Sequence, residues 1–256
     1  MSRPTSRERR EKILELLIEN NSVRVSTLCK LFNVSRETIR HDLFKLAEEG
    51  LIIKEHGSAT LNRESIVDID FAKRAREHAV QKRKIGMEAV KMIKDGETII
   101  IDSGSTTPHI ARNIKGMKNL TVITPSLKVT SELGGKEGIN VIMPGGIFNP
   151  IGYSLYGPQT EEFFSKINAN KFFLAIHGVD IEKGLTEINI QIAHLKQVMM
   201  NSAKEIILVA DSSKFGKIEY ATVAPLERVN TIITDRDLDE KIADEIRKLG
   251  INLILV

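Results

Sequence analysis

The chain has 256 residues, of which 41% are hydrophobic, and this is enough to bury a sizeable core in two domains. A formal net charge of +3 permits nucleic-acid binding without arguing for it, because the position of the charge matters more than its sum. Cys29 is the only cysteine, which excludes an intramolecular disulfide. We find no run of about 18 apolar residues and no apolar leader after Met1, so we expect a soluble cytoplasmic protein.

The first predicted helix follows Thr5-Ser6-Arg7-Glu8, which has the spacing of a capping box. Ile13, Leu14, Leu17 and Ile18 then recur at helical spacing and give this helix one apolar face. Residues 22–25 follow as a short extended piece.

Residues 25–46 predict two short helices joined by a tight turn. Leu28, Leu31 and Phe32 form an apolar stripe on the first helix, and Ile39, Leu43 and Leu46 form one on the second. Ser26 and Ser35 stand where N-cap hydroxyls are expected, and Asn33 tolerates the left-handed backbone of the turn. This is the pattern of a helix-turn-helix.

Polar side chains cover the face of the second helix opposite Ile39. Glu37 and His41 point away from the core, with Arg36, Arg40 and Lys45 on the flanks, so these side chains can reach a DNA groove. Ser35 and Thr38 lie at the helix N-terminus, where free N–H groups hold a phosphate. The alternative is a small helical interaction domain with an ordinary solvated basic face.

A β-hairpin is predicted after the helix stop at Gly50. Residues 51–55 and 59–61 are its strands, with the tip at His56-Gly57-Ser58, so that three helices and a hairpin make a winged helix. The motifs Thr38-Ile39-Arg40 and residues 55–59 resemble the DNA-binding domain of the DeoR family of bacterial transcriptional regulators. We expect DNA contacts from Ser26, Ser35, Arg36, Glu37, Thr38, Arg40, His41, Lys45, Lys54 and His56.

Two residues depart from the family pattern, which usually has a second arginine at the position of His41 and a second glycine at that of Ser58. Histidine cannot make the bidentate contact of arginine to guanine, so the first departure is expected to change base preference.

We place the DNA-binding domain at residues 1–61, a linker at 62–80 and a larger domain at 81–256. The linker is charged, as in Lys73-Arg74-Ala75-Arg76, and we interpret it as a solvated helix, with a second DNA contact as the alternative.

The larger domain alternates helices with short apolar runs. A helix with Ile85 and Ala89 is expected to end at Asp95-Gly96. The runs lie at 98–101, 120–123, 140–143, 172–176, 206–210, 231–234 and 251–256, and helical stretches separate most of them. This pattern predicts a three-layer α/β/α domain with a mainly parallel sheet.

Ligands bind at the carboxyl ends of strands in an open parallel sheet, so the loops that follow the apolar runs are candidates for a binding site. The first such loop leads into a helix at Pro108 with hydroxyl and N–H donors suited to an anion. Lys214 places a positive charge near a phosphate, and Asp180 and Asp211 are able to accept sugar hydroxyls. For each residue alone, a turn or helix cap is the alternative. The candidates in these loops are Asp102, Ser103, Gly104, Ser105, Thr106, Thr107, Thr124, Ser126, Gly145, Gly146, His177, Gly178, Asp180, Asp211 and Lys214.

These loops also resemble the effector domain of the DeoR family, and with the N-terminal match the resemblance covers nearly the whole chain. That domain is similar to ribose-5-phosphate isomerase, which implies a phosphorylated sugar as ligand and adds Lys196 to the site. This chain has Ile192-Ala193 where the family commonly has Glu-Ala, and His177 where Asp or Asn is usual. The ligand is therefore expected to differ from the commoner ones.

The function expected from these features is a repressor that binds an operator as a homo-oligomer and is released by a phosphorylated sugar, with activation left open. The alternative is a sugar-phosphate isomerase with an attached DNA-binding domain, but Ile192 removes one possible catalytic carboxylate. We expect no cofactor. The six histidines are scattered without ligand spacing, so we expect no metal either.

Overall fold

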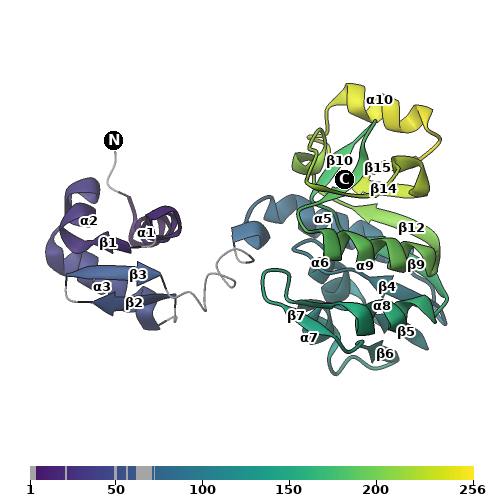
Figure 1. The fold of residues 1–256 in the computed structure, drawn as a ribbon, viewed down its shortest axis with the longest axis horizontal. Helices are drawn as coiled ribbons and strands as arrows, with labels where there is room; N and C mark the ends of the chain where they lie inside the picture. Colours follow the sequence, from purple (N-terminus) through teal and green to yellow (C-terminus); the bar gives the residue numbers. More distant parts are fainter. Residues whose placement is uncertain (1–3, 21, 49–50, 56, 62–70, 72) are drawn as a thin grey trace. The chain divides into compact units, whose positions relative to one another are not determined.

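A computed structural model describes residues 4–20, 22–48, 51–55, 57–61, 71 and 73–256. The chain divides into two compact units, Met1–Lys73 and Arg74–Val256 (Figure 1). The predicted helix stop at Gly50 and the predicted DNA contact His56 lie outside the described residues, as does most of the predicted linker.

The first unit is a winged helix. Helices α1 (Ser6–Asn20), α2 (Val25–Phe32) and α3 (Arg36–Glu48) accompany strands β1 (Ser22–Arg24), β2 (Ile52–Glu55) and β3 (Ser58–Leu61). The strands form an antiparallel sheet in the order β1-β3-β2. Ile13, Leu28, Ile39 and Leu46 are buried side chains from the three helices that pack in one core with Ala59 of the sheet.

Local signals placed two of these helix starts correctly. The Thr5 N–H donates to Glu8 Oε2 (2.8 Å) and the Glu8 N–H to Thr5 Oγ1 (3.3 Å), which confirms the capping box. The Thr38 N–H donates to Ser35 Oγ (3.1 Å), so Ser35 caps α3 as predicted. Asn33 has the left-handed φ of 50° that the turn requires.

Two predictions for α2 are wrong. The helix begins at Val25 after Arg24, so Ser26 lies inside it and does not cap it. The chain enters α2 directly from β1, and the Val25 N–H donates to the Gly57 carbonyl of the hairpin (3.0 Å). Leu31 is 56% exposed because it lies on the flank of the stripe that Leu28 and Phe32 bury.

A seven-stranded parallel sheet organises the second unit, in the order β15-β14-β12-β9-β4-β5-β6. The strands are β4 (Thr98–Ile101), β5 (Leu120–Ile123), β6 (Ile139–Ile142), β9 (Ala169–Leu174), β12 (Ala203–Val209), β14 (Thr231–Thr234) and β15 (Asn252–Leu255). All seven lie at or within three residues of the predicted apolar runs, and their parallel pairing confirms the predicted fold class.

Helices cover both faces of this sheet (Figure 1). One face packs against α5 (Ala79–Val90), α6 (Thr107–Asn113) and α7 (Leu127–Leu133), and the other against α8 (Pro158–Ser165), α9 (Ile190–Asn201) and α10 (Glu240–Lys248). Along β9, Phe172 and Leu174 enter one core while Phe173 enters the other, as the alternation of a strand requires. Helix α5 ends at Val90, before the predicted stop at Asp95-Gly96.

Two small antiparallel sheets add to the predicted layers. Strands β7 (Ile147–Asn149) and β8 (Ser154–Tyr156) form a hairpin, and β10 (Gly178–Asp180), β11 (Gly184–Glu187) and β13 (Ala221–Ala224) form a second sheet. Short 3₁₀ turns lie at Ser212–Lys214 and Leu226–Arg228. None of the helices formed by the described residues combines the length and the apolarity needed to cross a bilayer.

Candidate functional site

The first unit presents a groove between α3 and the β2–β3 hairpin. Arg36, Glu37, Arg40 and His41 line it from α3, and the hairpin contributes Lys54, Glu55, Gly57 and Ser58. Strands β2 and β3 pair with Lys54 opposite Ala59, and the hairpin lies next to α3 because Ile52 and Ala59 share a core with Ile39 and Leu43. Arg36, Arg40, His41 and Lys54 are all exposed, so their polar ends are available to a ligand in this groove.

The remaining predicted contacts surround the groove. Ser35 and Thr38 lie at the start of α3, where their hydroxyls bond each other (2.9 Å) beside the free N–H groups of the first turn. Lys45 pairs with Glu48 (2.8 Å) and Arg40 approaches Glu37 at 3.8 Å, both on the exposed surface, so these weak pairs leave the lysine and arginine free to rearrange. Ser26 is exposed on α2 and does not line the groove.

A buried ion pair fixes α3 under this surface. The Arg9 Nε of α1 donates to Asp42 Oδ2 of α3 at 2.5 Å, and their side chains are only 7% and 1% exposed. Because breaking such a pair leaves a charge buried without its partner, α1 and α3 are held at one mutual position. No local pattern in the sequence predicts this pair, because its two residues are 33 positions apart.

The second unit has a narrow cavity at the carboxyl ends of β4, β9 and β12. Loop 103–106 after β4 supplies N–H and hydroxyl donors, and Gly104 has a φ of +147°, with a Cβ at this position expected to lie 3.1 Å from that of Ala175. The lining residues are Arg74, Ser103, Gly104, Ser105, Thr106, Ala175, Ile176, His177, Lys196, Val209, Ala210 and Lys214. The structure therefore brings together seven of the predicted ligand contacts: Ser103, Gly104, Ser105, Thr106, His177, Lys196 and Lys214.

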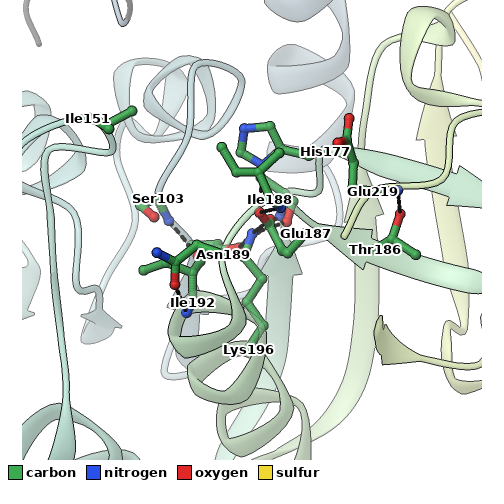
Figure 2. Close-up of polar contacts among 12 residues, drawn as sticks. Ser103, Ile151, His177, Thr186, Glu187, Ile188, Asn189, Ile192, Lys196 and Glu219 are labelled. Carbon is green, nitrogen blue, oxygen red and sulfur yellow. Dashed lines mark hydrogen bonds and ion pairs between the residues drawn. The ribbon is translucent and has the colours of Figure 1, made fainter. Parts of the chain in front are cut away.

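Lys196 is the centre of a buried charge cluster at this cavity (Figure 2). Its Nζ lies 3.0 Å from Asp102 Oδ2 and 2.7 Å from Glu187 Oε1, and it donates to the Ala175 carbonyl. Glu187 Oε2 is 2.6 Å from Nδ1 of His177, whose side chain is 27% exposed. The cluster connects the ends of β4, β9 and β11 with α9.

The charges of Lys196 and Glu187 hold each other in their ionised forms. Burial opposes the ionisation of Glu187, but the positive charge of Lys196 and the bond to His177 outweigh it and lower the pKa of Glu187 to about 2. Burial likewise opposes the charge of Lys196, yet Asp102 and Glu187 raise the pKa of Lys196. For Asp102, burial is the largest effect and raises the pKa of its carboxyl.

A second buried pair lies beside the cavity. Lys82 Nζ of α5 stands 3.8 Å from Asp211 Oδ2, with side-chain exposures of 3% and 1%. Lys82 Nζ also donates to the carbonyls of Arg74 and Glu77. Burial is the largest effect on Lys82 and lowers its pKa, while Asp211 raises it.

The other predicted ligand contacts do not line the cavity, and each has a structural partner. Asp102 and Asp211 are buried in the two ion pairs, and Asp180 accepts from the Glu182 and Lys183 N–H groups in a turn. Four of the remaining ones form hydrogen bonds within the fold: the hydroxyl of Thr107 donates to the Gly104 carbonyl, that of Thr124 donates to the Ile101 carbonyl, Ser126 caps α7, and the Gly145 carbonyl accepts from the Thr160 hydroxyl. The other two are closely packed glycines: a Cβ at Gly146 would lie 2.1 Å from Thr160, and one at Gly178 would lie 2.5 Å from Thr186.

Sequence reasoning missed two residues of this site. Glu187 ends β11, whose short, partly polar sequence gives no clear signal of a strand although the structure buries all four of its residues. It supplies a carboxylate to Lys196, while Ile192 lies one turn before Lys196 on α9 (Figure 2). Arg74 was assigned to the linker and carried no signal in the sequence for a place at the cavity.

Among the described residues, the His, Cys, Asp and Glu side chains do not form a group of three or more that could hold a metal.

Comparison with known proteins identifies the family. Residues 9–65 match the DeoR-like helix-turn-helix domain, and residues 77–236 match the DeoR C terminal sensor domain. The chain belongs to the DeoR family. It is therefore a DNA-binding transcriptional regulator, with the winged helix as its DNA-binding unit and the α/β unit as its sensor unit.

Full-length relatives agree with this assignment. The chain is 38% identical to the uncharacterized HTH-type transcriptional regulator YulB of Bacillus subtilis over 91% of this chain and 90% of that one. It is 33% identical to the HTH-type transcriptional regulator IolR of Bacillus subtilis over 90% of this chain and 92% of that one. It is 32% identical to the putative aga operon transcriptional repressor of Escherichia coli O157:H7 over 97% and 93%. These relatives are regulators, which favours this function over the isomerase alternative.

Among solved structures, ribose 5-phosphate isomerase A of Methanocaldococcus jannaschii is similar with a TM-score of 0.40 and 18% identity, over 54% of this chain and 55% of that one.

Proposed function

We propose that this regulator binds operator DNA through the groove between α3 and the β2–β3 hairpin. Arg36, Arg40 and His41 would read base edges in the major groove, while Ser35, Thr38 and Lys54 would contact phosphates. The proposal is supported by the exposed positions of these side chains and by the buried Arg9–Asp42 pair that fixes α3. Glu37, which lines the groove, remains a proposed DNA contact, as do Ser26, Lys45 and His56.

We further propose that the sensor unit binds a phosphorylated sugar. The observation that carries this proposal is the set of positive side chains at the cavity. Among the described residues, the lining includes Arg74 and Lys214, together with Lys196, which is paired with Asp102 and Glu187, and it includes no carboxylate. Hydroxyl and N–H donors of loop 103–106 complete a set of groups that anions bind. The cavity has a volume of only about 30 Å³, so we place the phosphate inside it and the sugar at its mouth.

His177 and Lys196 would face the sugar. Because Glu187 is ionised and its Oε2 lies 2.6 Å from Nδ1 of His177, Nδ1 would donate to this carboxylate and Nε2 would be left to meet a sugar hydroxyl. The family usually has Asp or Asn at position 177, and aspartate offers an oxygen acceptor on a shorter side chain. A histidine here is therefore expected to select a sugar that differs from the ligands of those relatives.

As a regulator, the protein would act as a repressor. A symmetric homo-oligomer would place its α3 helices in successive major grooves of an operator, and the effector would favour an arrangement that misaligns them. The effector must bind the two arrangements unequally to have this effect. Since its relatives are DNA-binding regulators of cells without a nucleus, in which DNA lies in the cytoplasm, the proposed location is the cytoplasm.

Isothermal titration calorimetry of the full chain tests the ligand class. Each sugar is tested as its phosphate ester and as the free sugar, and inorganic phosphate is included. We expect binding by one or more phosphate esters and none by the matching free sugars. A free sugar that binds as tightly as its ester would contradict the assignment of the cavity to phosphate.

A further inference from the structure

Arg74 lies both at the cavity and at the start of the sensor unit. It lines the cavity of the sensor unit, and it is the first residue of that unit after the segment that leads from the DNA-binding unit. Its Nη2 donates to the carbonyl of Ile151 (2.6 Å), in the turn between β7 and β8. Arg74 is the lining residue nearest in sequence to the DNA-binding unit, and all the others lie at 103 or beyond.

Lys82 anchors the backbone at Arg74 to the interior. Its buried Nζ donates to the Arg74 carbonyl and to the Glu77 carbonyl (2.7 Å), so these two bonds fix the turn that precedes α5 to the buried side chain of Lys82. The same Nζ faces Asp211, which begins the short 3₁₀ turn that carries Lys214. The buried Lys82–Asp211 pair therefore contacts the backbone of Arg74 through Lys82 and the turn that carries Lys214 through Asp211.

The charges around this pair favour an anion. Arg74 and Lys214 both act on Lys82 by repulsion and help burial to lower the pKa of Lys82, whereas Asp211 and Glu77 act in the opposite direction. Of the two negative groups, Asp211 is buried and turned to Lys82. A phosphate at the cavity would pair with the positive charges of Arg74 and Lys214.

We propose that Arg74 is a binding residue for the anionic group of the effector and that it transmits the occupancy of the cavity to the chain leading to the DNA-binding unit. An anion that draws the guanidinium into the cavity competes with the Ile151 carbonyl for the same donors. The turn at 74–77 then changes its position or its order, and that turn is continuous with the segment before it. This inference rests on the proposed function of the cavity as an anion site.

The experiment uses inorganic phosphate as the probe on the full chain, at constant ionic strength set with sodium chloride. Calorimetry gives the phosphate dissociation constant of the wild type, Arg74→Gln, Lys214→Gln and Arg83→Gln, an exposed arginine of α5 that serves as the matched control. We expect a rise of about ten- to a hundredfold for Arg74→Gln and for Lys214→Gln, since each loses one charged hydrogen bond. Arg83→Gln is expected to bind as the wild type does.

Hydrogen exchange of residues 74–82 then measures transmission, with phosphate adjusted to fill the site equally in each variant. We expect phosphate to change the exchange of this segment in the wild type and in Lys214→Gln, but not in Arg74→Gln. An unchanged dissociation constant for Arg74→Gln overturns its role in binding, and an equal exchange response in that variant overturns its role in transmission. In both cases the cavity remains an anion site. If the wild type fails to bind phosphate or any phosphate ester, the proposed function fails together with this inference.

Discussion

Replacing Lys196 by methionine is the change with the largest expected effect on the sensor unit. Methionine keeps most of the apolar stem but removes the charge that lies within 3.0 Å of Asp102 and 2.7 Å of Glu187. Both carboxylates are about 1% exposed or less, so they would stay buried without their shared cation. Breaking a buried ion pair in this way costs about 3–5 kcal/mol of unfolding free energy.

The pKa of Glu187 gives an independent magnitude. Its folded value of about 2 lies below the ordinary value of 4.5, so this carboxylate stabilises the fold above pH 4.5 and the stabilisation is lost as the pH falls toward 2. The shift corresponds to roughly 3 kcal/mol at neutral pH, and the charge of Lys196 is the largest single contribution that lowers the pKa, with His177 contributing as well. In Lys196→Met, burial acts on Glu187 without the opposing charge of Lys196. The difference in unfolding free energy between the wild type and this variant is therefore expected to be smallest at acid pH.

Tyrosine fluorescence measures this loss in the sensor unit alone, because Tyr153, Tyr156 and Tyr220 all lie there and the chain has no tryptophan. We expect the melting temperature to fall by roughly 6–20 °C at neutral pH, and by less at about pH 4. The matched control, Lys204→Met, changes an exposed lysine of β12 and is expected to stay within about 0.5 kcal/mol of the wild type. A Lys196→Met variant as stable as this control, or one with an equal loss at both pH values, would refute the reasoning.

Three further changes test the DNA-binding surface, the cavity and the support of α3. Arg40→Ala is expected to cost about 1–3 kcal/mol of specific DNA affinity, measured by fluorescence anisotropy, and unchanged affinity would remove Arg40 from the interface. Lys214→Ala is expected to bind DNA normally but to resist release at the effector concentration that releases the wild type; an equal response would exclude Lys214 from the site. Arg9→Met leaves Asp42 buried and unpaired and is expected to destabilise the DNA-binding unit by about 3–5 kcal/mol, measured by circular dichroism, whereas Arg9→Met/Asp42→Leu should recover much of the loss.

Local signals in the sequence predicted most of the fold. The capping box at Thr5 and the cap at Ser35 depend only on residues three positions apart, and both form as expected. Strands buried on both faces produce continuous apolar runs, which is why all seven strands of the large sheet were found. Ser26 was misplaced because the start of α2 is set by a bond from Val25 to the distant Gly57, which no local pattern contains.

The candidate site was only partly predictable for the same reason. The topological rule located loop 103–106, His177 and Lys214, because the carboxyl ends of neighbouring parallel strands meet at one edge. Glu187 lies on β11, in a small antiparallel sheet whose short, partly polar strands produce no clear pattern. Arg74 reaches the cavity through the tertiary contacts of Lys82 and Ile151, and a charged segment gives no sign of such contacts.

Fluorescence anisotropy with DNA from upstream of the protein's own gene tests the central claim most directly. The complex is formed at fixed salt, because phosphate contacts make affinity depend on ionic strength. It is then challenged with sugar phosphates and with the matching free sugars. Our account predicts tight binding that one or a few phosphorylated sugars release and their free counterparts do not. Tight binding that no phosphorylated compound disturbs, at concentrations shown by calorimetry to fill the cavity, would contradict the claim that this cavity controls DNA binding.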